Sequence, residues 1–171
     1  MFKITGAILI LAITTWGGFE FSRSYSNRTR QLRHFRNSLQ ALEAEIMYGH
    51  VPLSEAAGRL SKQMPKPVGQ FWGDFAAKLE KQDTTVKIAW EESLKAIGPL
   101  LALRKGELEI LAQFGETLGR HDRFQQQKQI ILTMTHLERE EEEAVQSQMK
   151  YEKMVKSLGF LSGLLLIILL L

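Results

Sequence analysis

The stretch that most constrains the fold runs from Asp122 to Leu171. It contains no proline, and its only glycines, Gly159 and Gly163, lie in an apolar tail. Asp122 is a favourable helix N-cap, and apolar residues recur behind it at helical spacing. At 1.5 Å per residue a single helix here is about 75 Å long. We therefore predict one helix that begins in a soluble bundle and ends in a membrane.

Both ends of the chain are almost free of charge. Ile4 to Phe19 is a run of sixteen uncharged residues, and Leu158 to Leu171 also carries no charge. A cleaved signal peptide and a buried soluble helix are alternatives for the first run, but it has neither a strongly basic start nor a typical cleavage site. Sixteen residues span about 24 Å, short of a hydrocarbon core of ~30 Å unless the bilayer thins locally. We interpret residues 1–21 and 158–171 as transmembrane segments.

Basic residues flank the two apolar runs on their inner sides. Five arginines follow the first run and three lysines precede the second: Arg23, Arg28, Arg30, Arg33, Arg36, Lys150, Lys153 and Lys156. Positive residues next to membrane segments favour the cytoplasmic side. The middle domain, residues 22–157, should therefore face the cytoplasm.

The middle domain has the apolar periodicity of helices throughout. Stripes at 3–4 spacing predict helices over 29–48, 53–64, 68–79, 86–97 and 101–118, followed by the long helix from Asp122. Short connections imply antiparallel neighbours. The fold class is thus all-α, a six-helix antiparallel bundle whose last helix continues into the membrane. Two apolar stripes suggest that the fifth helix is buried centrally, and Gly115 would let a neighbour approach it closely.

No constellation in the sequence indicates catalysis. The chain has no cysteine, and a net charge of +3 is too small to indicate nucleic-acid binding. There is no H-E-x-x-H spacing and no P-loop. Trp72 and Trp90 fall on helix stripes, which favours core packing over a ligand platform. We expect no enzyme activity, no cofactor and no bound metal.

The acidic run Glu138 to Glu143 is open to three interpretations. It is a solvated helix face, a docking surface for a basic partner, or a divalent-cation site. We expect the run to leave much of its surface free, so the partner-binding hypothesis rests on Glu140, Glu141 and Glu142.

Several longer strings resemble the stage III sporulation protein AB family. They are Thr14–Trp16, Gly18–Glu20, Leu42 to His50 followed by Pro52-Leu53, Ala89–Glu91, Phe114 to Arg123, Gln125 to Lys128, and Lys153 to Leu171. The residues that carry the resemblance are Glu45, Tyr48, Gly49, Pro52, Leu53, Trp90, Gly115, Leu118, Gly119, Asp122 and Gln126.

The resemblance implies a role that periodicity alone does not. The family is similar to the inner-membrane platforms of type II secretion and type IV pilus machines. The implied protein is a non-enzymatic scaffold of the channel between mother cell and forespore, in the mother-cell membrane. Its expected partners are the stage III AA ATPase, other channel components, membrane lipids and further copies of itself. The alternative is a membrane-tethered sensor or regulator, which a buried ionisable cluster would favour. The apolar stripes offer no such cluster.

Overall fold

The computed structural model describes residues 26–49, 51–81, 84–120 and 122–170. The described residues form six α-helices and no strand, so the all-helical prediction is confirmed. The first helix covers residues 26–44 and passes into a short π-helix, η1 (Glu45–Gly49). Then come α2 (Leu53–Gln63), α3 (Val68–Glu80), α4 (Val86–Ile97), the 3-10 turn η2 (Gly98–Leu100), α5 (Lys105–Thr117) and α6 (Arg123–Leu170).

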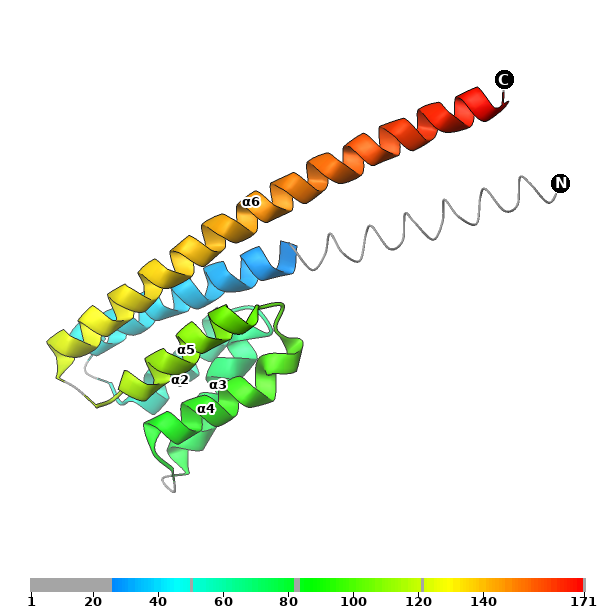
Figure 1. Cartoon of the computed structure of the whole chain (residues 1–171). Coiled ribbons are helices and arrows are strands. Elements are labelled where there is room, and N and C mark those ends of the chain that lie inside the picture. Colours follow the sequence, from blue (N-terminus) through cyan, green and yellow to red (C-terminus); the bar gives the residue numbers. More distant parts are fainter. Residues whose placement is uncertain (1–25, 50, 82–83, 121, 171) are drawn as a thin grey trace.

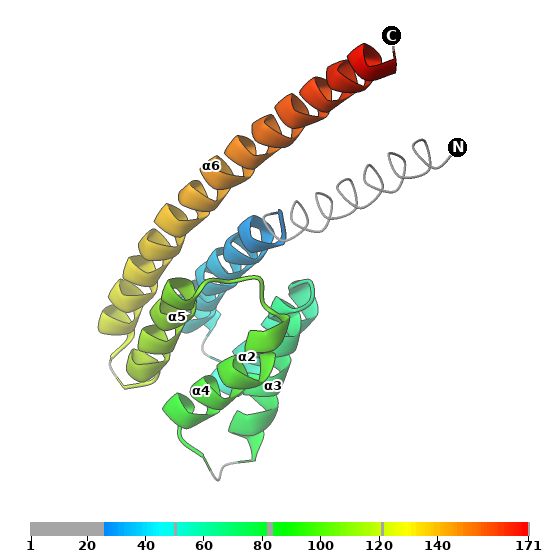
Figure 2. The ribbon, with the colours of Figure 1, turned by 45° about the vertical axis from the view of Figure 1, so that its right-hand side comes forward.

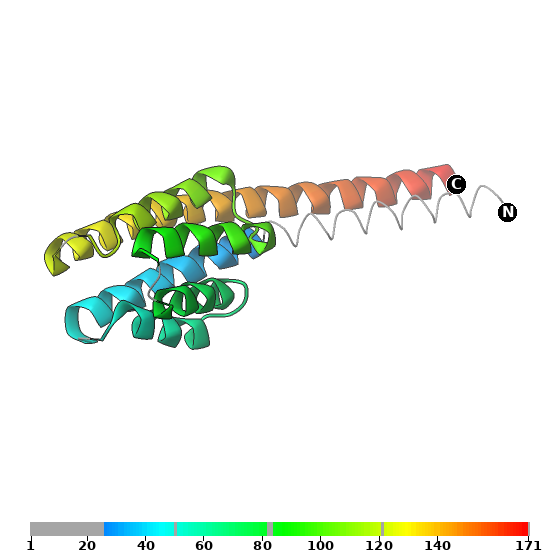
Figure 3. The same cartoon turned by 90° about the horizontal axis from the view of Figure 1, so that it is seen from below.

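The long helix α6 and the first helix lie side by side and run in opposite directions (Figure 1). Helix α5 packs along the N-terminal half of α6, and α2, α3 and α4 complete the bundle (Figures 2 and 3). The C-terminal half of α6 projects beyond the bundle, and we call this side the tail end (Figure 1). The turns after residue 44 and before Arg123 meet at the opposite side, the distal end.

The core is built on aromatic residues from α3 and α4. Trp90 contacts Phe71, Trp72, Phe75 and Phe114 edge-on, with ring centroids 4.7–5.5 Å apart. Its indole Nε1 donates a hydrogen bond of 2.8 Å to the carbonyl of Leu111. Both Trp72 and Trp90 are fully buried, as the stripes predicted.

Gly115 sits against the same tryptophan. A Cβ atom built on Gly115 would overlap the Trp90 ring. The prediction that Gly115 admits a close neighbour is therefore confirmed, and the neighbour is the α4 tryptophan.

The predicted bounds hold best for the second to fourth helices. The cap of α4 is Thr85, whose hydroxyl accepts a 3.3 Å hydrogen bond from the backbone of Ile88. The first helix was predicted to run to residue 48, but its α-helical part ends at residue 44 and the π-helix follows.

The fifth helix begins later than predicted, at Lys105 rather than near Leu101. The preceding segment is held outside the helix because the backbone N–H of Ala102 donates a 2.7 Å hydrogen bond to Gln31 Oε1. The prediction of central burial is also wrong, since Glu109, Gln113 and Glu116 are exposed. The two apolar stripes of α5 instead face two neighbours, α4 and α6, and leave a third side in solvent.

Only one of the two predicted membrane segments lies within the described residues. Residues 1–21 lie outside the described residues, whereas the segment from Leu158 continues α6 as far as Leu170. Within the described part of the chain, no helix has both the length and the apolar character that crossing a bilayer requires.

Candidate functional site

The distal end carries a pocket of about 340 Å³ between the turn that follows the first helix and the turn that precedes α6. Six of the residues that carry the family resemblance line this distal pocket: Glu45, Pro52, Leu53, Leu118, Gly119 and Gln126. Tyr48, Gly49 and Asp122 belong to the same two turns. Trp90 and Gly115 lie elsewhere, in the core.

The turn before α6 is held in one conformation by a left-handed glycine and two hydrogen bonds. Gly119 has φ +78°, a left-handed conformation that favours glycine. Its N–H donates to Gln126 Oε1 over 3.1 Å, and Asp122 Oδ1 accepts a 2.9 Å hydrogen bond from the N–H of Gln125. The predicted capping role of Asp122 is confirmed. Gln126 and Leu118 are thereby fixed as buried walls of the distal pocket.

Glu45 lies on the opposite wall of the distal pocket and is held there by contacts with Arg59. Its two carboxylate oxygens each lie 3.3 Å from Arg59 Nη1, and Glu55 contacts the same guanidinium at 2.8 Å. The hydrogen bond that Arg59 donates to Glu55 and the negative charge of Glu45 raise the pKa of Arg59. The π-helix also places Gly49 over Glu45, where a Cβ would meet Glu45 Oε2 at 2.5 Å. A side chain at position 49 would therefore displace the Glu45 carboxylate.

The distal pocket has an apolar floor and a mixed rim. Ile46, Val51 and Ala56 line it together with the charged groups of Glu45 and Arg123. Two large aromatic side chains are exposed at the same end: Tyr48 is 80% and Phe124 is 75% exposed. Such a surface suits an apolar anchor of a protein partner, because aromatic residues around a desolvated pocket are typical of interfaces.

The acidic run on α6 is largely engaged within the molecule. Glu141 is 6% exposed and contacts Arg33 at 2.8 Å and Arg36 at 3.3 Å. Glu140 lies 3.4 Å from Arg28. The expectation of a free surface is therefore wrong for these two carboxylates. Glu142 is exposed and makes no ion pair with the described residues. The partner-binding hypothesis for Glu140, Glu141 and Glu142 stays a prediction.

Arg28 and Glu107 form a buried ion pair that was not predicted from the sequence. Arg28 Nε donates a 2.7 Å hydrogen bond to Glu107 Oε1, and both side chains are almost completely buried. The apolar stripes offered no ionisable cluster, and they did not indicate this pair because both residues lie off them. The two residues stand 79 positions apart in the chain, so no local pattern links them. Three of the arginines that we read as membrane flanks, Arg28, Arg33 and Arg36, pair with glutamates of α5 and α6.

Among residues 26–49, 51–81, 84–120 and 122–170, no three His, Asp or Glu side chains are grouped so that they could hold a metal ion. The buried Arg28 and Glu107 side chains pair with each other, and neither lines the distal pocket.

Three comparisons with known proteins identify the same family. Residues 3–171 match the family model of stage III sporulation protein AB. The chain is 54% identical over 170 residues to stage III sporulation protein AB of Bacillus subtilis (strain 168), covering 99% of both chains. A solved structure of stage III sporulation protein AB superposes with a TM-score of 0.70 at 50% identity, covering 72% of this chain and 98% of the other.

Proposed function

Because the chain belongs to the stage III sporulation protein AB family, we propose that it is a non-enzymatic platform of the secretion-like channel between mother cell and forespore. Both ends hold it in the mother-cell membrane, and the bundle faces the cytoplasm. The distal pocket docks the cytoplasmic stage III AA ATPase. One observation carries this proposal: residues from turns far apart in the chain, Glu45 to Leu53 and Leu118 to Gln126, converge on one pocket.

The membrane tether is supported by the sequence and by the exposed part of α6. The uncharged runs at both ends are flanked on their inner sides by basic residues, as the positive-inside rule requires. Beyond the bundle, α6 exposes large apolar side chains: Met149, Met154, Val155, Leu158, Leu161 and Leu165. Exposed apolar side chains in such number favour contact with lipid or protein over water.

The position of the distal pocket supports a cytoplasmic partner. It lies at the end of the bundle opposite to the projecting half of α6 (Figure 1). If the tail end is anchored in the bilayer, the distal end reaches furthest into the cytoplasm. A soluble ATPase could reach this end without steric conflict with the membrane.

The experiment replaces both exposed aromatic residues of the distal end, Tyr48→Ala with Phe124→Ala. The variant is expressed in a Bacillus subtilis strain that lacks its own relative, once the unmodified chain has been shown to restore sporulation. We expect loss of heat-resistant spores and loss of the ATPase from the detergent-solubilised complex. The matched control is Leu100→Ala, which removes an apolar side chain of 60% exposure outside the distal pocket and should leave both readouts unchanged. Normal sporulation and normal co-purification in the aromatic variant would refute docking at the distal pocket.

A further inference from the structure

Gln126 uses only one end of its side-chain amide within the described part of the molecule. Its Oε1 accepts a 3.1 Å hydrogen bond from the backbone N–H of Gly119. Its Nε2 is buried and has no hydrogen-bond partner among the described residues. The amide cannot be turned over to exchange the two atoms, because the Gly119 N–H would then face a second donor. Gln126 therefore carries an unpaired donor in a side chain that is only 4% exposed.

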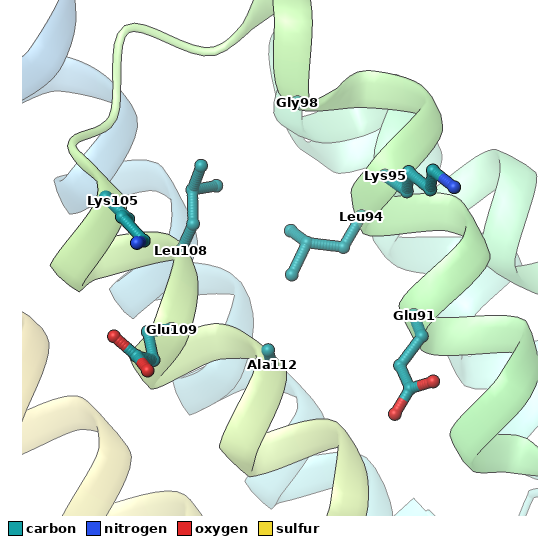
Figure 4. Close-up of a pocket in the computed structure, with 8 residues that line it drawn as sticks. All are labelled: Glu91, Leu94, Lys95, Gly98, Lys105, Leu108, Glu109 and Ala112. Atoms are coloured by element: carbon teal, nitrogen blue, oxygen red, sulfur yellow. The ribbon is translucent and has the colours of Figure 1, made fainter.

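The residue that carries this unpaired donor lines the distal pocket. Buried polar side-chain atoms usually have a partner, so an unpaired one beside a pocket points to a contact with another molecule. The second hollow of the bundle, the α4–α5 hollow, differs in this respect. None of its lining residues, Leu94, Leu108 and Ala112 among them, carries a buried unpaired side-chain atom (Figure 4). The distal pocket is therefore the better candidate for a recognition site.

The lining of the distal pocket carries no net charge. Its other side chains are mainly apolar: Ile46, Val51, Pro52, Leu53, Ala56 and Leu118. Its two charged members, Glu45 and Arg123, have opposite signs. Arg59 is shared between Glu45 and Glu55, so it does not cancel both carboxylates. Glu45 would therefore repel a carboxylate and Arg123 would repel an ammonium group, whereas an uncharged polar group meets neither repulsion.

The unpaired donor sets a condition on any apolar side chain that docks in the distal pocket. A side chain that fills the pocket closes it to water and leaves the docked segment as the source of an acceptor for Gln126. A buried donor without an acceptor costs more free energy than a neutral hydrogen bond gains. The segment must therefore bring an oxygen atom beside its apolar side chain. The backbone carbonyl that every residue carries meets this need without adding charge.

The backbone on both sides of the distal pocket is irregular. Glu45 and Ile46 belong to the π-helix η1, and Gly119 has a left-handed conformation. π-helical turns are rare and are frequent at functional sites. The two irregular turns together form the pocket, which supports a site built for a partner rather than a defect in packing.

We propose that Gln126 selects the segment that docks in the distal pocket. Its Nε2 donates a hydrogen bond to a backbone carbonyl of a partner segment whose apolar side chain enters the pocket. Its Oε1 stays bound to Gly119, so one amide both holds the wall of the pocket and recognises the partner. This inference rests on the proposed docking at the distal pocket and adds the chemistry of the contact.

Gln126→Glu in the full chain removes the donor and keeps the acceptor. One carboxylate oxygen still accepts from Gly119, and the other takes the place of Nε2 and repels the carbonyl. In the Bacillus subtilis strain that lacks its own relative, we expect the ATPase recovered with the solubilised complex to fall about tenfold, and heat-resistant spores to fall with it. The matched control is Gln125→Glu, the same change at an exposed position outside the distal pocket, which should leave both readouts unchanged.

Gln126→Met serves as a second variant, because it removes the donor without burying a charge. It should lower the recovery of the ATPase in the same way, while the amount of the chain in the membrane fraction stays normal. Normal recovery with a well-expressed variant at position 126, together with loss in the Tyr48→Ala, Phe124→Ala variant, would overturn the role of Gln126 and leave docking at the distal pocket intact. Normal recovery in all of these variants would refute the docking itself.

The peptide that cross-links to a photo-reactive residue at position 48 reports the kind of oxygen. Identified by mass, it should have an apolar residue at the cross-linked site. An aspartate or glutamate at that site would assign the contact to a carboxylate and overturn the uncharged acceptor.

Discussion

Gly115 sets the distance between α4 and α5, because the Trp90 ring occupies the space that a side chain at position 115 would need. The sequence could indicate that a glycine inside an apolar helix permits close packing. It could not indicate which residue fills the space, since Trp90 belongs to another helix. The same limit applies to Arg28 and Glu107, whose pairing depends on how three helices meet.

The packing at Gly115 gives the first prediction. Gly115→Ala should destabilise the bundle by about 1–3 kcal/mol, the usual cost of inserting a methyl group into a filled core. Gly58→Ala is the matched control, because Gly58 lies inside α2 with open space around it and alanine favours a helix. Thermal melting of the purified chain, followed by circular dichroism, measures both. Equal melting temperatures for the Gly115→Ala variant and the unmodified chain would contradict the close contact.

The buried ion pair gives the second prediction. Arg28→Ala should destabilise the chain by about 3–5 kcal/mol, because it leaves the Glu107 carboxylate buried without its partner. Replacing both residues by apolar side chains, Arg28→Met with Glu107→Leu, should cost less than the single change. Denaturant titration of the two variants measures the difference. A double variant less stable than Arg28→Ala would show that the pair itself contributes strongly to stability.

At the scale of elements, local patterns predicted the helices and missed their irregular ends. The bounds of α2, α3 and α4 follow from prolines, threonine caps and apolar stripes that lie within each segment. The π-helix after residue 44 and the late start of α5 depend on contacts with distant residues, such as the hydrogen bond between Gln31 and Ala102. The distal pocket could not be predicted from local patterns either, because two turns that are far apart in the chain form it. Its residues were nevertheless among those that carried the family resemblance.

The start of α6 gives the third prediction. Asp122→Ala should destabilise the bundle by about 1 kcal/mol, since it removes the hydrogen bond that caps the N–H of Gln125. Asp122→Asn keeps an oxygen acceptor and should cost much less. Comparing the melting temperatures of the two variants tests the capping role. Equal losses would assign the effect to the negative charge rather than to the cap.

The acidic run gives the fourth prediction, a contrast between adjacent glutamates. Glu141→Lys should unfold or strongly destabilise the chain, because it places a positive charge between Arg33 and Arg36 in a buried site. Glu142→Lys should leave the melting temperature nearly unchanged, since Glu142 is exposed. If Glu141→Lys melted like the unmodified chain, α6 could not pack against the first helix as the structure has it.

At the scale of the whole molecule, the distal pocket lies on a bundle whose long last helix projects from the opposite end (Figure 1). A second hollow, between α4 and α5, lies elsewhere on the bundle (Figure 4). A partner docked at the distal pocket, as we propose, would stand on the side away from the proposed membrane tether. The pocket and the tether would then be available at the same time, as the proposed platform requires.

The most direct test of the central claim is a photo-reactive amino acid placed at position 48, on the exposed rim of the distal end. The full-length variant is produced in sporulating Bacillus subtilis in place of the native relative, and cross-linked products from the membrane fraction are identified by mass. A reactive residue at position 62 on α2 serves as the control. We predict a cross-link to the stage III AA ATPase from position 48 and none from position 62. Cross-linking of the ATPase from position 62 alone, or from neither position, would contradict docking at the distal pocket.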